Sequence, residues 1–191
     1  MSIKRITSPL SRDDARALRC GEAVLLSGVI YTARDAAHMR LSELAAQGSA
    51  MPFPIDGAIV YYVGPTPAKP GCVIGSAGPT TSYRMDANTP ALIPLGLTGM
   101  IGKGARSSGV VEAMKKYGAV YFCAVGGAGA LLARCVVSSE VVAYEDLGAE
   151  AIRRLEVRDM PLTVVIDSEG TDLYKKGREE YLRQKSESDD K

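Results

Sequence analysis

The stretch AVLLSGVIYTARDAAHMRLSELAAQG, residues 23–48, decides the fold class of this chain. Its first eleven residues are apolar and rich in β-branched side chains, which predicts a buried strand over 23–33. The chain then passes directly into helix formers, with Ala37, Leu41 and Leu44 at helical spacing and Gly48 as the terminator. A buried strand that leads into an amphipathic helix is the repeating unit of an α/β domain.

The same succession recurs along the rest of the chain. Ser11 predicts the N-cap of a brief early helix, with Asp14 three residues on. We expect further strands over 58–64, 72–77, 119–125, 138–147 and 161–174, a strand and a helix within 97–118, and a short helix over 130–136. These elements predict one α/β domain over residues 1–191, with a mixed sheet or two sheets and a polar helical tail from about residue 175.

The composition limits the classes of partner. The 191 residues carry a formal net charge of +1 and are 46% hydrophobic, which is typical of a soluble globular domain. No global basic field would draw the chain to nucleic acid or to an anionic membrane. No apolar run approaches the roughly 18 to 20 residues of a membrane span, and the N-terminal residues lack a signal-peptide core. We therefore expect a cytoplasmic protein with no nucleic-acid or membrane partner.

The cysteines do not predict a metal site. The four, Cys20, Cys72, Cys123 and Cys135, are scattered, form no CxxC pair, and are accompanied by one histidine. A zinc or iron–sulfur site needs about four such ligands close together. We expect reduced, buried thiols and no metal ligands in this chain.

Two glycine-rich loops resemble nucleotide-binding motifs, but each lacks a residue that the motif requires. GLTGMIGKGARSS has Leu97 and Gly104 where a phosphate-binding loop needs glycine and Ser or Thr. VGGAGALLA has Leu132 where a dinucleotide fingerprint needs its third glycine. Gly127 and Gly129 could instead present backbone donors to an anion at a helix N-terminus. A tight turn between strand and helix explains the same loop equally well.

Three predicted strand-to-loop junctions each present a cation: Arg34, Arg84 and Lys103. The carboxyl ends of strands are where α/β folds place ligand sites. Arg84 offers a planar fork for a carboxylate and Thr80 a nearby hydroxyl, so the three loops together predict a site for a small dianion such as a dicarboxylate.

Charged residues near the predicted site could instead have a structural role. Arg34 stands in a first helical turn, where the helix dipole disfavours a positive charge, and could pair instead with Asp35 or Glu43. Asp86 and Arg106 are expected to support these loops as an ion pair. His38 could face the site or pack in the core.

Four motifs in this order resemble the β subunit of two-subunit class I fumarate hydratases. They are TARDAAHMR (32–40), GPTTSYRMD (78–86), GKGARS (102–107) and VGGAGALLA (125–133). The resemblance continues through residues 147–174 and extends to the C-terminal part of single-chain class I fumarases and to the β subunit of L-tartrate dehydratase. It implies a swivelling β/β/α three-layer domain with mixed sheets.

The resemblance also implies an activity and its residues. The family hydrates fumarate reversibly to L-malate with a [4Fe–4S] cluster, which an iron–sulfur α subunit would supply to this chain. Arg34 and Arg84 would bind substrate carboxylates, Thr80 would handle the C3 proton, and Lys103 would contact substrate and stabilise charge. The expected assembly is a hetero-oligomer, with a homodimer open for the isolated chain.

The substrate has alternatives. The RDAAH motif, residues 34–38, looks closer to the fumarase version than to that of the tartrate enzyme, while GPTTS-x-RM is shared by both. Fumarate is therefore favoured and tartrate is the runner-up. A non-catalytic dicarboxylate-binding module is the alternative from a different class.

Overall fold

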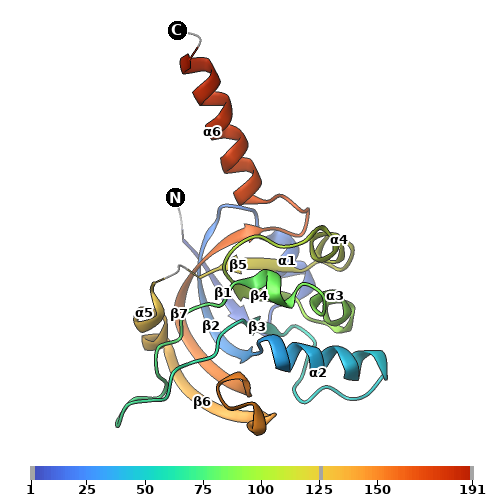
Figure 1. Ribbon diagram of the computed structural model, residues 1–191, viewed down its shortest axis with the longest axis vertical. Coiled ribbons are helices and arrows are strands. Elements are labelled where there is room, and N and C mark those ends of the chain that lie inside the picture. Colours follow the sequence, from blue (N-terminus) through green and yellow to red (C-terminus); the bar gives the residue numbers. More distant parts are fainter. Residues whose placement is uncertain (1–2, 125–126, 190–191) are drawn as a thin grey trace.

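Strands and helices alternate along the chain, as the sequence predicts (Figure 1). The computed structural model describes residues 3–124 and 127–189. Within them the strands are β1 (Lys4–Ser8), β2 (Ala23–Thr32), β3 (Ile59–Tyr61), β4 (Gly99–Gly102), β5 (Val120–Cys123), β6 (Val136–Ala143) and β7 (Ile152–Ile166). The α-helices are α1 (Arg12–Ala17), α2 (Asp35–Ala46), α3 (Thr89–Leu92), α4 (Ser108–Tyr117), α5 (Gly129–Arg134) and α6 (Leu173–Asp189), and the 3-10 helices are η1 (Ser82–Met85), η2 (Ile93–Leu95) and η3 (Glu145–Glu150).

The strands form one mixed sheet in the order β1-β2-β3-β4-β5-β7-β6, which confirms the mixed-sheet prediction. The pairs from β1 to β5 are parallel, whereas β7 runs antiparallel to β5, β6 and β2. Because β7 pairs with β2 as well as with β5, the ladders close a ring through β2, β3, β4, β5 and β7. This ring brings the carboxyl ends of three parallel strands, β2, β3 and β4, to one edge.

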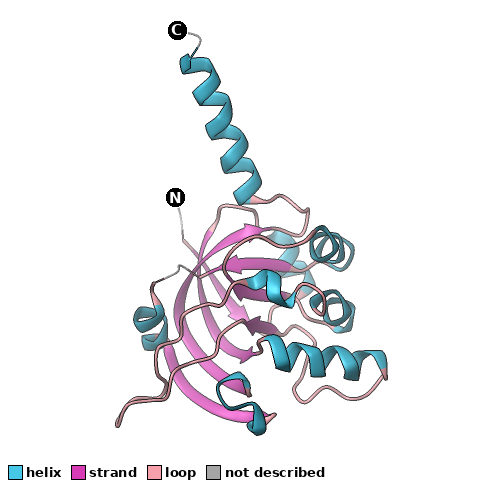
Figure 2. Ribbon diagram, in the orientation of Figure 1, coloured by secondary structure: helices cyan, strands magenta, loops and turns pink. Residues whose placement is uncertain are grey.

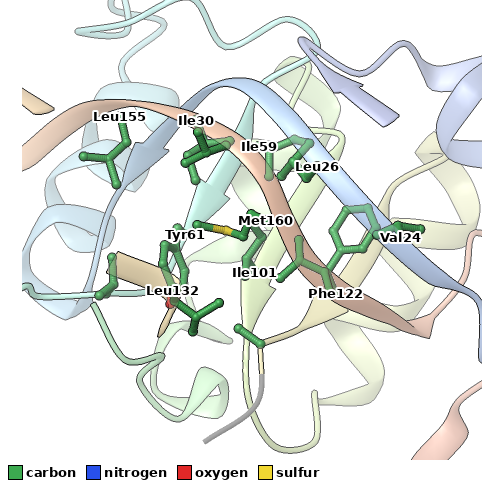
Figure 3. Packing of buried hydrophobic residues seen from close by; sticks show 14 of the residues in the cluster. Val24, Leu26, Ile30, Ile59, Tyr61, Ile101, Phe122, Leu132, Leu155 and Met160 are labelled. Atoms are coloured by element: carbon green, nitrogen blue, oxygen red, sulfur yellow. The ribbon is translucent and has the colours of Figure 1, made fainter. Parts of the chain in front are cut away.

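The core is divided between the two faces of the central strands. Successive residues of β3 alternate: Ile59 and Tyr61 join a cluster with β2 and β7, while Val60 joins a cluster with the helices. Figure 3 shows the first cluster, in which Ile59 and Tyr61 lie among side chains such as Met160 of β7. Burial on both faces is typical of parallel strands and fixes their register firmly.

The helices are distributed unequally around the sheet (Figure 2). Helices α2, α3 and α4 lie together along one face, and residues from all three belong to the second core cluster. Helix α5 lies on the opposite side, and α6 projects away from the body of the molecule (Figure 1). The helical tail expected from about residue 175 therefore begins at Leu173.

Local sequence signals explain several of these boundaries. Ser11 caps α1, because its Oγ accepts a hydrogen bond from the amide of Asp14 at 3.0 Å, as predicted. Helix α4 ends at Gly118, which adopts a left-handed conformation with φ +73°. Both boundaries are set by interactions between residues close together in the sequence, which is why the sequence predicts them.

Two expectations about strands were wrong. Residues 72–77 form no strand, because they fold back on residues 64–71: the amide of Thr66 donates to Ser76 O and its Oγ1 accepts from the Ser76 amide. The strand expected over 161–174 is instead β7, which begins at Ile152 and ends at Ile166, while residues 173 and 174 belong to α6. A register shift against β2 leaves Asp159, two residues before Pro161, with φ +48°, and this bulge interrupts the alternating pattern that would have revealed the strand.

Candidate functional site

Asp35 joins the two arginines that were predicted to bind a carboxylate. Its Oδ1 accepts a hydrogen bond from Nε of Arg84 at 2.7 Å, and its Oδ2 lies 3.5 Å from Nη2 of Arg34. Arg34 stands where β2 ends and α2 begins, whereas Arg84 lies in η1. Two segments almost fifty residues apart thus present their guanidinium groups around one acid. The ion pair of Arg34 with Asp35, foreseen as an alternative to ligand binding, is present.

A second acid, Glu150 from the end of η3, also faces Arg34. Its Oε1 lies 3.4 Å from Nη2 of Arg34, and its Oε2 accepts the amide of Ala36 at 3.0 Å in the first turn of α2. A Cβ on Gly64 would lie 2.8 Å from Nη1 of Arg34, so this glycine leaves room for the guanidinium. Nε of Arg34 is buried and has no hydrogen-bond partner within the described residues. Arg34 is therefore held by charge rather than by short hydrogen bonds.

The segment with Thr80 and Arg84 rests on the carboxyl ends of β3 and β4. The amide of Thr80 donates to Tyr62 O at 2.7 Å, and the amide of Ser82 donates to Lys103 O at 2.9 Å. In return, Oγ of Ser82 accepts the amide of Lys103 at 3.1 Å. The backbone bonds thus place Thr80, Arg84 and Lys103 on adjoining segments at one edge of the sheet.

Buried polar side chains hold the segments at this edge of the sheet in place. Oγ of Ser82 lies 2.8 Å from the hydroxyl of Tyr121, which donates to Gly104 O at 2.9 Å. Burial raises the pKa of Tyr121, so its hydroxyl stays protonated and able to donate. The glycine loop that carries Lys103 is consequently tied to β5 and to the start of η1.

Arg106 completes this set of side chains as a fully buried cation. Its Nε donates to Oδ1 of Asp86 at 2.7 Å, which confirms the predicted pair, and its Nη atoms contact the hydroxyls of Tyr62 and Thr89. Asp86 also accepts the amide of Ser107 at 2.5 Å. Because Arg106 is satisfied from all sides, it holds η1 and α3 against the sheet and does not offer itself to a ligand.

His38 packs in the core behind Arg34. Its ring is fully buried, makes an edge contact with Tyr62 at a centroid distance of 5.1 Å, and has neither nitrogen hydrogen-bonded within the described residues. Burial, aided by the positive charge of Arg106, lowers its pKa to about 4. The sequence left open whether His38 faces the site or packs in the core, and the structure shows that it packs in the core.

The second glycine loop lies against the segment that leads to Thr80. The amide of Ala77 donates to Gly129 O at 3.0 Å, and a Cβ on Gly129 would approach the amide nitrogen of Gly78 to 3.0 Å. Gly129 therefore permits close backbone packing, and Gly127 has φ +82°. The first two residues of VGGAG lie outside the described part of the chain, and anion binding by Gly127 and Gly129 stays a prediction.

The site is open rather than enclosed by this chain. A hollow of about 590 Å³ lies between residues 66–76 and α5, and none of Arg34, Thr80, Arg84 or Lys103 lines it. The cations are instead partly exposed, with 21% of the Arg34 side chain and 46% of the Arg84 side chain accessible. A ligand held here would remain uncovered on one side.

The cysteines do not fit a cluster site. All four are free, Cys72 is exposed and the others are half-buried, so the expectation of buried thiols was wrong. Burial raises the pKa of the Cys20 and Cys135 thiols, which opposes the thiolate that iron requires. Among the side chains that the structure describes, no group of three or more His, Cys, Asp and Glu could hold a metal ion. No helix in the described part of the chain is long and apolar enough to cross a membrane.

Two contributors were not foreseen from the sequence. Glu150 is 114 residues from the helix turn that it caps, and no local pattern marks it. The hydroxyl of Tyr174 accepts the amide of Gly104 at 3.3 Å and lies 3.6 Å from Sγ of Cys123, so the chain beyond β7 touches the Lys103 loop. The RDAAH motif indicates part of this arrangement, because Asp35 directly follows Arg34 and can pair with it.

Comparison with known proteins adds independent evidence. The family model described as "Fumarase C-terminus" matches residues 2–177. "Fumarate hydratase class I, aerobic" of Escherichia coli (strain K12) is 40% identical over 151 residues, which are 78% of this chain and 28% of that protein. "Fumarate hydratase 2" of Leishmania major is 36% identical over 158 residues, 82% of this chain and 28% of that protein. "Putative L(+)-tartrate dehydratase subunit beta" of Methanocaldococcus jannaschii is 37% identical over 171 residues, covering 86% of this chain and 88% of that protein.

Proposed function

Because this chain belongs to the fumarase C-terminus family, we propose that it is the β subunit of a heteromeric [4Fe–4S] hydro-lyase that interconverts fumarate and L-malate. The observation that carries the proposal is the joining of Arg34 and Arg84 through Asp35, beside the loop with Lys103. Three cations at one edge suit a substrate with two carboxylates, and the fumarate hydratases among the relatives support the choice of reaction.

The proposed roles follow from the chemistry of the groups. Arg34 and Arg84 bind the substrate carboxylates, and holding both ends of a diacid fixes the orientation of its double bond. Removing the proton at C3 of malate adds negative charge to the neighbouring carboxylate. Preorganised guanidinium and ammonium groups stabilise that charge in the transition state. The Nη atoms of Arg84 remain to bind a carboxylate, because Nε donates to Asp35.

Thr80 is the proposed carrier of the C3 proton. A threonine hydroxyl is a weak base, so a nearby cation must stabilise its deprotonated form. Lys103 is the candidate for this, because the segment after Thr80 is hydrogen-bonded to the backbone of Lys103. The Lewis acid for the leaving hydroxyl would come from the cluster of the partner subunit, since the cysteines of this chain do not fit one.

The proposed partner is an iron–sulfur α subunit. The chain spans 28% of the length of the two fumarate hydratases compared above and 88% of the archaeal relative, whose name describes it as a subunit beta and so supports a partner subunit. An open site is consistent with a partner that covers it. We further propose the family's three-layer β/β/α arrangement, a hetero-oligomer as the active form, and a cytoplasmic location.

A reconstitution experiment tests this function. The chain is purified alone and together with a candidate iron–sulfur α subunit from the same organism, both anaerobically, and fumarate hydration is followed by ultraviolet absorbance. We expect the isolated chain to be colourless and inactive and the complex to be brown and active. Strong hydratase activity of the isolated chain would refute the need for a partner, and an inactive complex with a full cluster would refute the reaction.

L-Tartrate dehydration is the second candidate, favoured by the archaeal relative that this chain covers over most of its length. The complex should be assayed with fumarate, L-malate and L-tartrate under the same conditions. A larger kcat/KM for fumarate and malate supports the first function, and a larger value for tartrate supports the second. Dicarboxylate-induced thermal stabilisation of the isolated chain, with an inactive complex, would indicate a binding module instead.

A further inference from the structure

Glu150 makes two contacts at the start of α2, and both act on the same corner of the site. Its Oε2 accepts the amide of Ala36 at 3.0 Å, which satisfies one of the free donors of the first helical turn. Its Oε1 lies 3.4 Å from Nη2 of Arg34. One carboxylate therefore both caps the first turn of α2 and directs the arginine that precedes this helix.

The two contacts of Glu150 compensate for an unfavourable residue at the start of α2. Arg34 is the N-cap residue of α2 and makes no side-chain capping bond, and a cation is unfavourable at a helix N-terminus. Glu150 supplies both the missing acceptor and the missing negative charge. Asp35 gives a second negative charge to the same Nη2, so the nitrogen is held between two acids.

The remaining contacts of Arg34 are weak. Its Nε is buried with no hydrogen-bond partner within the described residues, and Nη1 faces the bare backbone of Gly64. An arginine fixed by short hydrogen bonds needs no further support, but this side chain depends on its two ion pairs for orientation. Asp35 is shared with Arg84, whereas Glu150 makes an ion pair with Arg34 alone among the described residues.

We propose that Glu150 is a positioning residue for the reaction: it holds the guanidinium of Arg34 toward the substrate carboxylate. The inference rests on the proposed function, because it takes Arg34 as a substrate ligand. Glu150 acts through Arg34 and does not touch the reacting atoms. Its position at the end of η3 also makes the β6–β7 connection a part of the site.

The substitution Glu150→Gln separates the two contacts. The glutamine oxygen can still accept the Ala36 amide, so the cap survives while the ion pair with Arg34 is lost. In the complex with the α subunit we expect KM for fumarate to rise about tenfold and kcat to change less, because carboxylate anchoring serves ground state and transition state alike. Glu145→Gln, the same exchange at an exposed acid of η3, is the control and should leave both constants unchanged.

A double-mutant cycle shows whether Glu150 acts through Arg34. In an Arg34→Met background, Glu150→Gln should no longer change KM, whereas a general structural role would give the same factor in both backgrounds. A fall in KM for Glu150→Gln in the Arg34 background would also overturn the proposal, since Glu150 would then compete with substrate.

A nuclear magnetic resonance measurement keeps this inference separate from the proposed function. If the wild-type complex has no hydratase activity, the proposed function fails, but the exchange of the Arg34 Nε proton can still be compared in the isolated chain. We expect faster exchange in Glu150→Gln and no change in Glu145→Gln. Equal exchange in all three proteins would overturn the positioning role.

Discussion

At the scale of single residues, Arg84 shows why arginine and lysine are not equivalent in this site. Its Nε donates to Asp35 at 2.7 Å, which orients the rest of the planar guanidinium toward the open side. An ammonium group has one charged centre, so it could keep the contact with Asp35 or reach a ligand, but it could not form a fork.

We therefore expect Arg84→Lys to lower kcat/KM for fumarate by about 100-fold or more while the fold is retained. The side chain is 46% exposed, so little packing is lost. Steady-state kinetics of the complex and circular dichroism of the chain are the measurements. Arg158→Lys, at an exposed position of β7, is the matched control. Near-normal kinetics for Arg84→Lys would remove Arg84 from the site.

His38 predicts an acid-dependent loss of stability. Its pKa is lowered to about 4 by burial, so the unfolded chain binds the proton at higher pH than the folded one. The stabilisation is complete above pH 6.5, the ordinary value, and is lost as pH falls from there toward 4. The loss between pH 7 and pH 5 is on the order of 2 kcal/mol.

The variant His38→Phe isolates this effect, because the chain has one histidine and phenylalanine keeps a ring against Tyr62. Urea unfolding at pH 7, 6 and 5 should show that wild type loses about 2 kcal/mol more than the variant. Parallel pH profiles for the two proteins would show that His38 does not titrate in this range.

At the scale of elements, Arg106 connects η1 and α3 to the central strands. It is a buried cation that contacts Asp86, Tyr62 and Thr89, and its guanidinium lies over the rings of Tyr62 and Tyr121, 5.1 Å from each centroid. The loops with Arg84 and Lys103 rest on these same contacts. Their geometry thus depends on a residue that faces away from the site.

Removal of this cation should be costly. We expect Arg106→Leu to reduce the free energy of unfolding by about 3 to 5 kcal/mol, because Asp86 is left buried without its charge partner. Asp86→Asn should cost less, since the amide oxygen can still accept the Ser107 amide. The double variant should cost less than the sum of the two, as measured by urea denaturation. Additive losses would mean that the two charges do not interact.

At the scale of the whole molecule, α6 stands apart from the domain. It projects from the body in Figure 1, and its side chains from Tyr174 to Ser186 are exposed. The family match ends at residue 177, within its first turns. The beginning of the helix contacts the site edge through the hydroxyl of Tyr174, whose pKa partial burial raises to about 12.

Truncation should distinguish the two parts of this helix. A chain that ends at Gly177 should melt within about 2 °C of wild type and assemble normally. A chain that ends at Asp172 lacks Tyr174, and we expect its midpoint to fall by about 4 °C or more because the Gly104 contact is lost. Differential scanning fluorimetry gives both values. Equal melting of the two truncations would show that Tyr174 does not support the Lys103 loop.

The sequence by itself determined the strand-to-helix order, the mixed sheet and the cap of α1, because these depend on periodicity and on contacts within a few residues. It also singled out Arg34, Arg84 and Lys103 as cations that follow predicted strands. Strands β2 and β4 do precede Arg34 and Lys103, whereas the strand expected over 72–77 does not form and Arg84 lies in η1. The pair of Asp86 and Arg106 could be anticipated because both belong to adjoining motifs.

The tertiary structure alone decided how these cations are held. Asp35 bridges Arg34 and Arg84 only because η1 comes to rest beside the start of α2. Glu150 reaches Ala36 across 114 residues through the β6–β7 connection, and the part of β7 that precedes its bulge was not predicted. Contacts between segments so far apart in the sequence depend on how β7 pairs with both β2 and β5 to close the ring of strands. Local sequence patterns do not predict that pairing, because they report only on neighbouring residues.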